Sequence, residues 1–261
     1  RLSIAYSHPQ WLVERLLTLL GAEETAQFLR IDNEAAPMTA QVNPLKTNAD
    51  ALMRELSGEG IAAVPHEWVP DCLELSDTGD LTTLAAFYQG RFTVQDAAAK
   101  LVTCAAGFQK GQRVLDVCAA PGGKSFAAAF VMENEGHILS CDLHENKLKR
   151  IREGAQRLGI TCIETACADG RVFRSEWAGQ FDVVICDVPC SGLGIIRKKP
   201  DIRYKSPDEF TALPEIQRAI LSNSARYVKA GGVLVYSTCT ILPDENEQVT
   251  DAFLLAHPSF A

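Results

Sequence analysis

The feature that most constrains the fold of this chain is a regular alternation of short apolar runs with longer amphipathic segments after residue 96. The apolar runs cover residues 113–118, 137–141, 161–165, 181–187 and 233–238. Helix-length segments separate them, including a basic one at 144–158 and another at 208–228 that we expect to end at Gly231-Gly232. Strands that alternate with helices pair in parallel. The pattern therefore predicts an α/β fold with a doubly wound parallel sheet in residues 91–261.

The first 90 residues have a different pattern, which predicts a smaller α+β domain. We expect an N-terminal helix capped by Ser7, with Pro9 in its first turn and Gly21 at its end. Further elements are expected at 23–31 (helix), 39–43 (strand), 48–58 (helix) and 61–64 (strand). Residues 1–90 hold five Lys or Arg against 13 Asp or Glu, whereas residues 91–261 hold 20 of each. Because pattern and charge change together, we place the domain boundary at residue 90.

Composition excludes several classes of protein. With 47% hydrophobic and 22% charged residues the chain is typical of a globular protein, and no apolar run approaches the roughly 20 residues that span a bilayer. The nine cysteines are irregularly spaced without a CxxC pair, and no histidines lie at zinc-ligand spacings. We therefore expect free thiols, a reducing cytoplasmic environment, no secretory leader and no metal. The net charge of −8 means that any nucleic-acid contact depends on a local basic patch.

Polar residues follow several of the predicted strands, and the first such group is rich in glycine. The segment from Asp116 to Ser125 reads Asp-Val-Cys-Ala-Ala-Pro-Gly-Gly-Lys-Ser. Glycines let the backbone approach a ligand closely, and the helix that follows offers free N–H groups. The spacing matches neither a Walker A loop nor the GxGxxG pattern of dinucleotide sites. A plain tight turn is the alternative interpretation of the glycines alone.

Two acids follow the next two strands. Asp142 ends the second strand, where an acid can accept hydrogen bonds from both ribose hydroxyls of a ligand, although it can equally cap the helix that starts near His144. Asp169, before Gly170, follows the third strand and can reach an adenine amino group; taken alone, it is better explained as an ordinary Asp-Gly turn. Ligands of such sheets bind beyond the carboxyl ends of the strands, so these groups are expected to face one crevice.

Two cysteines lie just beyond the fourth and fifth strands. Cys190 belongs to Asp187-Val-Pro-Cys-Ser-Gly, and Cys239 to Ser237-Thr-Cys-Thr. A structural cysteine tends to lie inside a strand, as we expect for Cys186, whereas a cysteine past the strand end faces the crevice, where thiolate chemistry is possible.

Methylation of carbon 5 of a cytosine would explain two thiols and an acid at this edge. Carbon 5 is a poor nucleophile until a thiolate adds to carbon 6, and an acid near ring nitrogen 3 stabilises the adduct. The carbon 5 proton must then leave and the thiol must be expelled, which a second thiol can assist. These residues alone do not decide which thiol attacks.

The chain resembles the Nop/Sun family of RNA cytosine-5 methyltransferases over most of its length. The resemblance is carried by Val42-Asn-Pro-Leu-Lys46-Thr, Gln89-Gly-Arg91-Phe-Thr-Val-Gln95-Asp96, Asp116 to Ser125, Asp187 to Gly192, Ser237 to Cys239, and Pro243-Asp244-Glu245-Asn246-Glu247. It implies a Rossmann-like methyltransferase sheet that uses S-adenosylmethionine (SAM). It also implies a NusB-like helical domain before Arg1 and a closing strand pair after Ala261.

The resemblance assigns roles to individual residues. It implies that Asp142 holds the SAM ribose, that Asp169 contacts the adenine, and that Asp187 lies near the methyl donor and the cytosine. Cys239 would be the nucleophile, and Cys190 would assist product release. The residues that would wrap SAM are Cys118, Ala119, Ala120, Pro121, Gly122, Gly123 and Lys124.

The implied partner is small-subunit ribosomal RNA, bound by a monomer. In the acidic N-terminal part we expect RNA contacts only from Asn43, Lys46 and Arg91. Basic residues after the Pro-Cys motif are the main expected RNA contacts: Arg197, Lys198, Lys199 and Arg203. The basic helix at 144–158 is better explained as a solvated outer face. The alternatives are a transfer RNA cytosine-5 methyltransferase and a non-catalytic RNA-binding or assembly module that keeps the fold.

Overall fold

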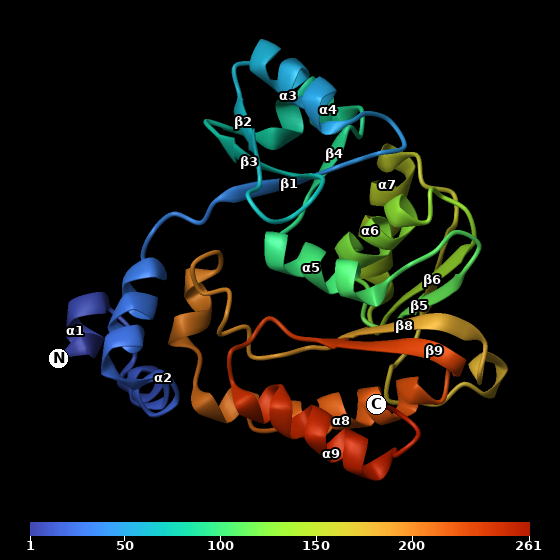
Figure 1. Ribbon diagram of the computed structural model, residues 1–261. Coiled ribbons are helices and arrows are strands. Elements are labelled where there is room, and N and C mark those ends of the chain that lie inside the picture. Colours follow the sequence, from blue (N-terminus) through green and yellow to red (C-terminus); the bar gives the residue numbers. More distant parts are fainter. The chain divides into compact units, whose positions relative to one another are not determined.

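The computed structural model describes residues 1–261, which form two compact units. The sheet unit comprises Pro37–Val188 and Ala219–Ser237 and contains every β-strand. The helical unit comprises Arg1–Ala36, Pro189–Arg218 and Thr238–Ala261. Figure 1 labels the elements of both units.

A five-stranded, fully parallel sheet occupies most of the sheet unit, in the order β7-β6-β5-β8-β9. Its strands are β5 (Arg113–Asp116), β6 (His137–Asp142), β7 (Ile163–Cys167), β8 (Phe181–Asp187) and β9 (Val228–Ser237). The doubly wound α/β prediction is confirmed. The predicted end of a helix at Gly231-Gly232 is wrong, because α8 (Leu213–Ala225) ends earlier and β9 runs through both glycines. A register shift against β8 between Phe181 and Val183 accommodates this part of β9.

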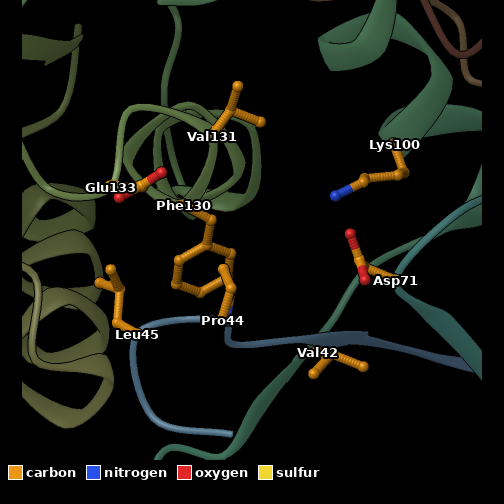
Figure 2. Close-up of a pocket in the computed structure, with 8 residues that line it drawn as sticks. All are labelled: Val42, Pro44, Leu45, Asp71, Lys100, Phe130, Val131 and Glu133. Carbon is orange, nitrogen blue, oxygen red and sulfur yellow. The ribbon is translucent and has the colours of Figure 1, made fainter. Parts of the chain in front are cut away.

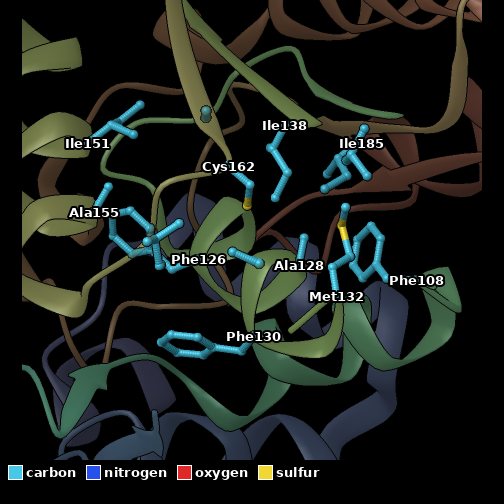
Figure 3. Close-up of a cluster of buried hydrophobic side chains, with 14 of the residues drawn as sticks. Phe108, Phe126, Ala128, Phe130, Met132, Ile138, Ile151, Ala155, Cys162 and Ile185 are labelled. Atoms are coloured by element: carbon cyan, nitrogen blue, oxygen red, sulfur yellow. The ribbon is translucent and has the colours of Figure 1, made fainter. Parts of the chain in front are cut away.

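Side chains of these strands are apolar on both faces of the sheet, so helices cover the faces. The helices α5 (Ala97–Ala106), α6 (Gly123–Val131) and α7 (Glu145–Leu158) lie on one face (Figure 1). Strand and helix side chains there form one buried core (Figure 3), including Val114, Ile138, Ile185, Phe126, Phe130, Leu148 and Ile151. This core includes residues of β5 and β8, and predicted site residues follow the carboxyl ends of these strands.

A smaller antiparallel sheet completes the sheet unit, in the order β2-β3-β1-β4. Its elements are β1 (Met38–Val42), α3 (Ala49–Gly58), β2 (Ala62–Pro65), β3 (Cys72–Ser76), α4 (Ala85–Tyr88) and β4 (Phe92–Val94). The predicted helix at 48–58 is present, with the Asn48 side chain accepting the N–H of Ala51. Strands β3 and β4 were not predicted, and β4 lies beyond residue 90. The prediction of an α/β sheet with a smaller α+β part is confirmed.

The helical unit contains α1 (Leu2–Tyr6), α2 (Gln10–Ile31) and α9 (Glu247–Ala256). The predicted helix cap at Ser7 is wrong: Ser7 adopts a left-handed conformation at the end of α1, and α2 starts only after Pro9. Gly21, predicted to end a helix, is the non-helical kink inside α2. The core of the unit joins α2 to the later segments through Leu12, Leu16, Leu29, Leu193, Ile196, Ile202 and Leu242.

No helix of the chain combines the length and the apolar character needed to cross a bilayer. No group of three or more His, Cys, Asp or Glu side chains is arranged to hold a metal ion.

Candidate active site

The glycine-rich segment forms a tight loop between β5 and α6 that opens into a pocket of about 190 Å³. Gly122 has a φ of +112°, and a Cβ there would lie 2.5 Å from Phe126 Cζ in the core. A side chain at this position would therefore be both strained and in collision, which explains the glycine. The pocket is lined by Val94, Gln95, Ala99, Asp116, Cys118, Ala119, Ala120, Pro121, Gly123, Lys124 and Asp187.

An ion pair crosses this pocket at the ends of two neighbouring strands. Lys124 Nζ lies 2.6 Å from Asp187 Oδ2, and Ser237 Oγ donates to Asp187 Oδ1 at 2.8 Å. The Asp187 carboxylate is therefore held in one orientation by partners from α6 and from the end of β9. Lys124 and Asp187, both predicted site residues, are brought together as a pair.

Asp116 is a second acid of the pocket, and no role was predicted for it. Its side chain is 1% exposed, and its Oδ2 accepts a hydrogen bond from Ser125 Oγ at 2.8 Å. Its Oδ1 is buried without a hydrogen-bond partner. Burial, together with the negative charge of Asp187, raises the pKa of Asp116 to about 7. A cationic ligand group would stabilise the charged form of this acid.

Asp142 lies at the end of β6, as predicted, and is largely buried. Its Oδ1 accepts the backbone N–H of His144 at 2.9 Å, so one oxygen serves the start of α7. Its other oxygen has no such contact. Asp142 therefore supports the backbone just before α7 but does not cap the helix, and one oxygen is left as an acceptor for a ligand.

Asp169 lies after β7 and forms a bidentate pair with Arg171. Nε of Arg171 lies 2.9 Å from Oδ1, and Nη2 lies 2.6 Å from Oδ2. These hydrogen bonds lower the pKa of Asp169 below its usual value. An adenine contact by Asp169 would therefore share the carboxylate with Arg171.

The two predicted crevice thiols lie together in the helical unit. Sγ of Cys190 and Sγ of Cys239 are 3.0 Å apart, and the backbone N–H of Cys239 donates to Cys190 Sγ at 3.2 Å. Cys239 is exposed and Cys190 is half-buried. The contact with Cys239, followed by burial, raises the pKa of Cys190 strongly. Two thiols this close can share one proton, so one of them can act as a thiolate while the other donates its S–H to it.

Hydrogen bonds fasten the two thiol loops to each other, and sequence reasoning missed the residues responsible. The buried Glu245 accepts the N–H of Ser191 at 2.9 Å and Gln217 Nε2 at 2.8 Å. The N–H of Gly194 donates to the carbonyl of Cys239 at 3.0 Å. Glu245 had been quoted only as part of a motif; its burial, which the sequence does not show, identifies it as a positioning residue.

The three predicted RNA contacts of the N-terminal part are engaged within the sheet unit. The amide of Asn43 is fully buried and donates to the carbonyls of Gly90 and Leu158, both at 2.8 Å. Nζ of Lys46 donates to the carbonyls of Gln89 and Arg157, and burial lowers the pKa of Lys46. Nη1 of Arg91 donates to the Lys46 carbonyl at 2.8 Å. These contacts indicate a structural role in joining β1 to α7, with no donor of the Asn43 side chain left over.

The basic residues after the Pro-Cys motif fall into two groups. Arg203 is buried and donates to the side chain of Asn33 at 2.9 Å, and Arg197 donates to the carbonyl of Ala35 at 2.7 Å. Both arginines therefore fasten the end of α2 inside the helical unit. Lys198 and Lys199 are exposed. Of the predicted RNA contacts, these two lysines are best placed to meet a phosphate backbone.

A larger pocket, of about 470 Å³, lies elsewhere in the sheet unit (Figure 2). Its lining includes Lys100 of α5 and Phe130 of α6, together with Leu45 from the loop after β1. Burial lowers the pKa of Lys100. None of the predicted site residues lines this pocket.

The parallel sheet, the glycine loop after its first strand and the acids after the next two strands define the class of this protein. They are the features of an α/β domain that binds a nucleotide-like ligand along the carboxyl ends of its strands.

Comparisons with known proteins identify the family within this class. Residues 104–261 match the model of the family described as 16S rRNA methyltransferase RsmB/F, and residues 8–82 match its ferredoxin-like domain. The chain is 40% identical to the probable ribosomal RNA small subunit methyltransferase B of Bacillus subtilis (strain 168), with 100% of this chain and 58% of the relative covered. It is 39% identical to ribosomal RNA small subunit methyltransferase B of Vibrio cholerae, with 97% of this chain and 58% of that relative covered.

A solved structure, that of PH0851, has the same fold. It superimposes with a TM-score of 0.95 and 34% identity, covering 98% of this chain and 58% of the other. The chain belongs to the RsmB/F family of 16S rRNA methyltransferases. This confirms the resemblance and the expected cofactor, SAM. The chain spans 58% of the length of the two curated relatives.

Proposed function

We propose that this protein methylates carbon 5 of a cytosine in small-subunit ribosomal RNA, acting as a cytoplasmic monomer through a covalent cysteine–cytosine adduct. The observation that carries the proposal is the pair of thiols 3.0 Å apart. Methyl transfer to nitrogen or oxygen requires no thiol, whereas methylation at carbon 5 requires one nucleophile that adds to the ring and is later expelled.

The residues of the 190 Å³ pocket fit SAM as the methyl donor. The loop from Cys118 to Lys124 would wrap it, Asp142 would accept its ribose hydroxyls, and Asp169 would meet its adenine. The pocket also offers an unpaired buried carboxylate oxygen on Asp116, which suits the ammonium group of the ligand. SAM, when bound, supplies an electrophilic methyl group.

The protein residues perform the remaining chemistry. The Cys239 thiolate forms a bond to carbon 6, and the ring electrons make carbon 5 nucleophilic. The Lys124–Asp187 pair supplies the proton that ring nitrogen 3 takes up as the adduct forms, and Lys124 orients the Asp187 carboxyl group. After methylation, a water molecule takes the proton from carbon 5, the electron pair of that C–H bond forms the double bond between carbons 5 and 6, and the bond between carbon 6 and sulfur breaks so that Cys239 leaves as a thiolate. Cys190, protonated beside it, stabilises this thiolate by donating its S–H.

RNA binding is expected to depend on the exposed lysines of the loop after β8. Replacement of Lys199 by alanine should weaken RNA binding several-fold and reduce the slope of log affinity against log salt by about one, because one phosphate contact is lost. The measurement is filter binding of a ribosomal RNA fragment at several salt concentrations. Lys149→Ala is the matched control, since Lys149 is also exposed and pairs with Glu153 on α7. Equal salt slopes for Lys199→Ala and the unmodified chain would contradict this assignment.

The experiment that tests the function is methylation of unmodified RNA transcripts. The chain is incubated with SAM carrying a tritiated methyl group and with small-subunit ribosomal RNA or transfer RNA, and the RNA is digested to nucleosides. We expect label in 5-methylcytidine from the ribosomal RNA alone. Label only in transfer RNA would move the substrate to that class. SAM binding without label in either RNA would contradict catalysis by this chain and favour a non-catalytic binding module.

A further inference from the structure

We propose that the side-chain amide of Gln95, together with Asp116, binds the amino-acid end of SAM. This inference rests on the SAM site of the proposed function and extends it to Gln95, a residue without an assigned role. Gln95 follows β4, lines the same pocket as the glycine loop, and is 7% exposed. Neither its Nε2 nor its Oε1 has a hydrogen-bond partner. Burying an amide without partners costs free energy, and a ligand in the pocket offsets that cost.

The strand order indicates which end of the ligand this pocket holds. The residues proposed for the adenine and the ribose, Asp169 and Asp142, follow β7 and β6. The pocket is lined instead by residues at the ends of β5 and β8, the next two strands in the sheet. A ligand lying along the carboxyl edge with its nucleoside over β7 and β6 brings its amino-acid end to β5 and β8, which is where Gln95 and Asp116 lie.

The chemistry of the pocket matches a zwitterion. The α-ammonium group of SAM has three donors, for which the unpaired Oδ1 of Asp116 and the Oε1 of Gln95 are acceptors. The α-carboxylate needs donors, which are the Nε2 of Gln95 and the free N–H groups of the first turn of α6. A Cβ on Gly123, the first residue of α6, would lie 3.5 Å from Gln95 Nε2, so the amide and the helix start converge.

The test compares SAM with a ligand that lacks its amino-acid end. Dissociation constants of SAM and of 5′-methylthioadenosine are measured by titration calorimetry for the unmodified chain, for Gln95→Leu and for Gln41→Leu. Gln41 is the matched control, because its amide is also buried without a partner but does not line this pocket. For Gln95→Leu we expect SAM affinity to fall about 10- to 100-fold, because hydrogen bonds to charged groups are lost, with little change for methylthioadenosine. Gln41→Leu should leave both affinities unchanged.

Unchanged SAM affinity in Gln95→Leu, or an equal loss for both ligands, would overturn the inference. An unmodified chain that binds neither ligand would instead refute the SAM site of the proposed function. If Gln95→Leu does not fold, Gln95→Glu keeps the side-chain shape. It replaces the N–H group that donates to the SAM carboxylate by a negatively charged oxygen. That variant should bind SAM more weakly but keep its affinity for decarboxylated SAM, and equal weakening of both would also count against the inference.

Discussion

Replacement of Cys190 by alanine is expected to stop the reaction at a covalent protein–RNA adduct. Cys239 would still attack carbon 6, but its expulsion would lack the neighbouring thiol that lies 3.0 Å away and stabilises the departing sulfur. The adduct should then accumulate as a slowly migrating band on a denaturing gel after incubation with SAM and unmodified small-subunit ribosomal RNA.

Replacement of Cys239 by alanine should have a different outcome. Without the nucleophile no adduct forms, and methyl transfer should fall by about 10⁴-fold or more, as when a covalent catalyst loses its nucleophile. The double variant should also give no band. A band from Cys239→Ala, lost when Cys190 is also replaced, would reverse the two roles.

The control for these variants is Cys104→Ala. Cys104 is an exposed cysteine of α5, in the sheet unit and outside the thiol pair, so its loss should leave turnover intact. SAM affinity, measured in parallel, should be unchanged in all of these cysteine variants because none of them lines the SAM pocket.

The second large effect is expected from Asp116→Asn, which should stabilise the chain in a strongly pH-dependent way. Burial raises the pKa of Asp116 from 3.8 to about 7, so the folded state binds the proton more tightly than the unfolded state does. The stability due to this proton is fully present below pH 3.8 and is lost as the pH rises to about 7. Asparagine resembles the neutral acid and avoids this loss.

The free energies of unfolding of Asp116→Asn and the unmodified chain should therefore be similar near pH 4. At pH 8 the variant should be more stable by about 4 kcal/mol, an upper estimate from the pKa difference. Urea unfolding at several pH values measures this difference. Asp169→Asn is a control that should destabilise the chain, because hydrogen bonds from Arg171 lower the pKa of Asp169. Its free energy of unfolding should fall by less than about 1 kcal/mol, since the Asp169–Arg171 pair is partly exposed. A difference in the free energy of unfolding between Asp116→Asn and the unmodified chain that does not vary with pH would contradict a raised pKa of Asp116.

The Asp116→Asn variant should also bind SAM more weakly. The buried carboxylate of Asp116 destabilises the free protein, but beside the ammonium group of SAM it stabilises the complex. Asp116 thus illustrates a common conflict between stability and function, in which a buried charge is retained for the ligand that neutralises it.

Much of the large sheet could be predicted because its signals are local. Each strand is a short apolar run, and the predicted run at 181–187 coincides with β8. The predicted limits of α8 and β9 were wrong because Gly231-Gly232 resembles a helix terminus locally, whereas β9 continues through both glycines, which lie where its register against β8 shifts. Strands β3 and β4 were missed because their pairing with β1 links residues far apart in the chain.

The residues of the candidate site likewise fall into those whose positions the local sequence predicted and those whose positions it did not. The positions of Asp142, Asp187 and both thiols at strand ends followed from the motifs, since a motif and the strand before it are neighbours in sequence. The burial of Asn43 and Arg203, both expected to meet RNA, did not follow, because their partners lie 115 and 170 residues away along the chain. A basic or amide side chain has the same local appearance whether it faces solvent or fastens two elements.

The sequence by itself determined the class of chemistry, because a glycine loop, strand-end acids and two strand-end thiols carry their reactivity in their own functional groups. Only the tertiary structure decided that the two sulfurs are 3.0 Å apart, that Glu245 joins their loops, and that the amide of Gln95 lacks a partner inside the pocket. The physical reason is that reactivity belongs to a residue and its neighbours in the chain, whereas distance, burial and hydrogen-bond satisfaction belong to contacts between segments that only folding brings together.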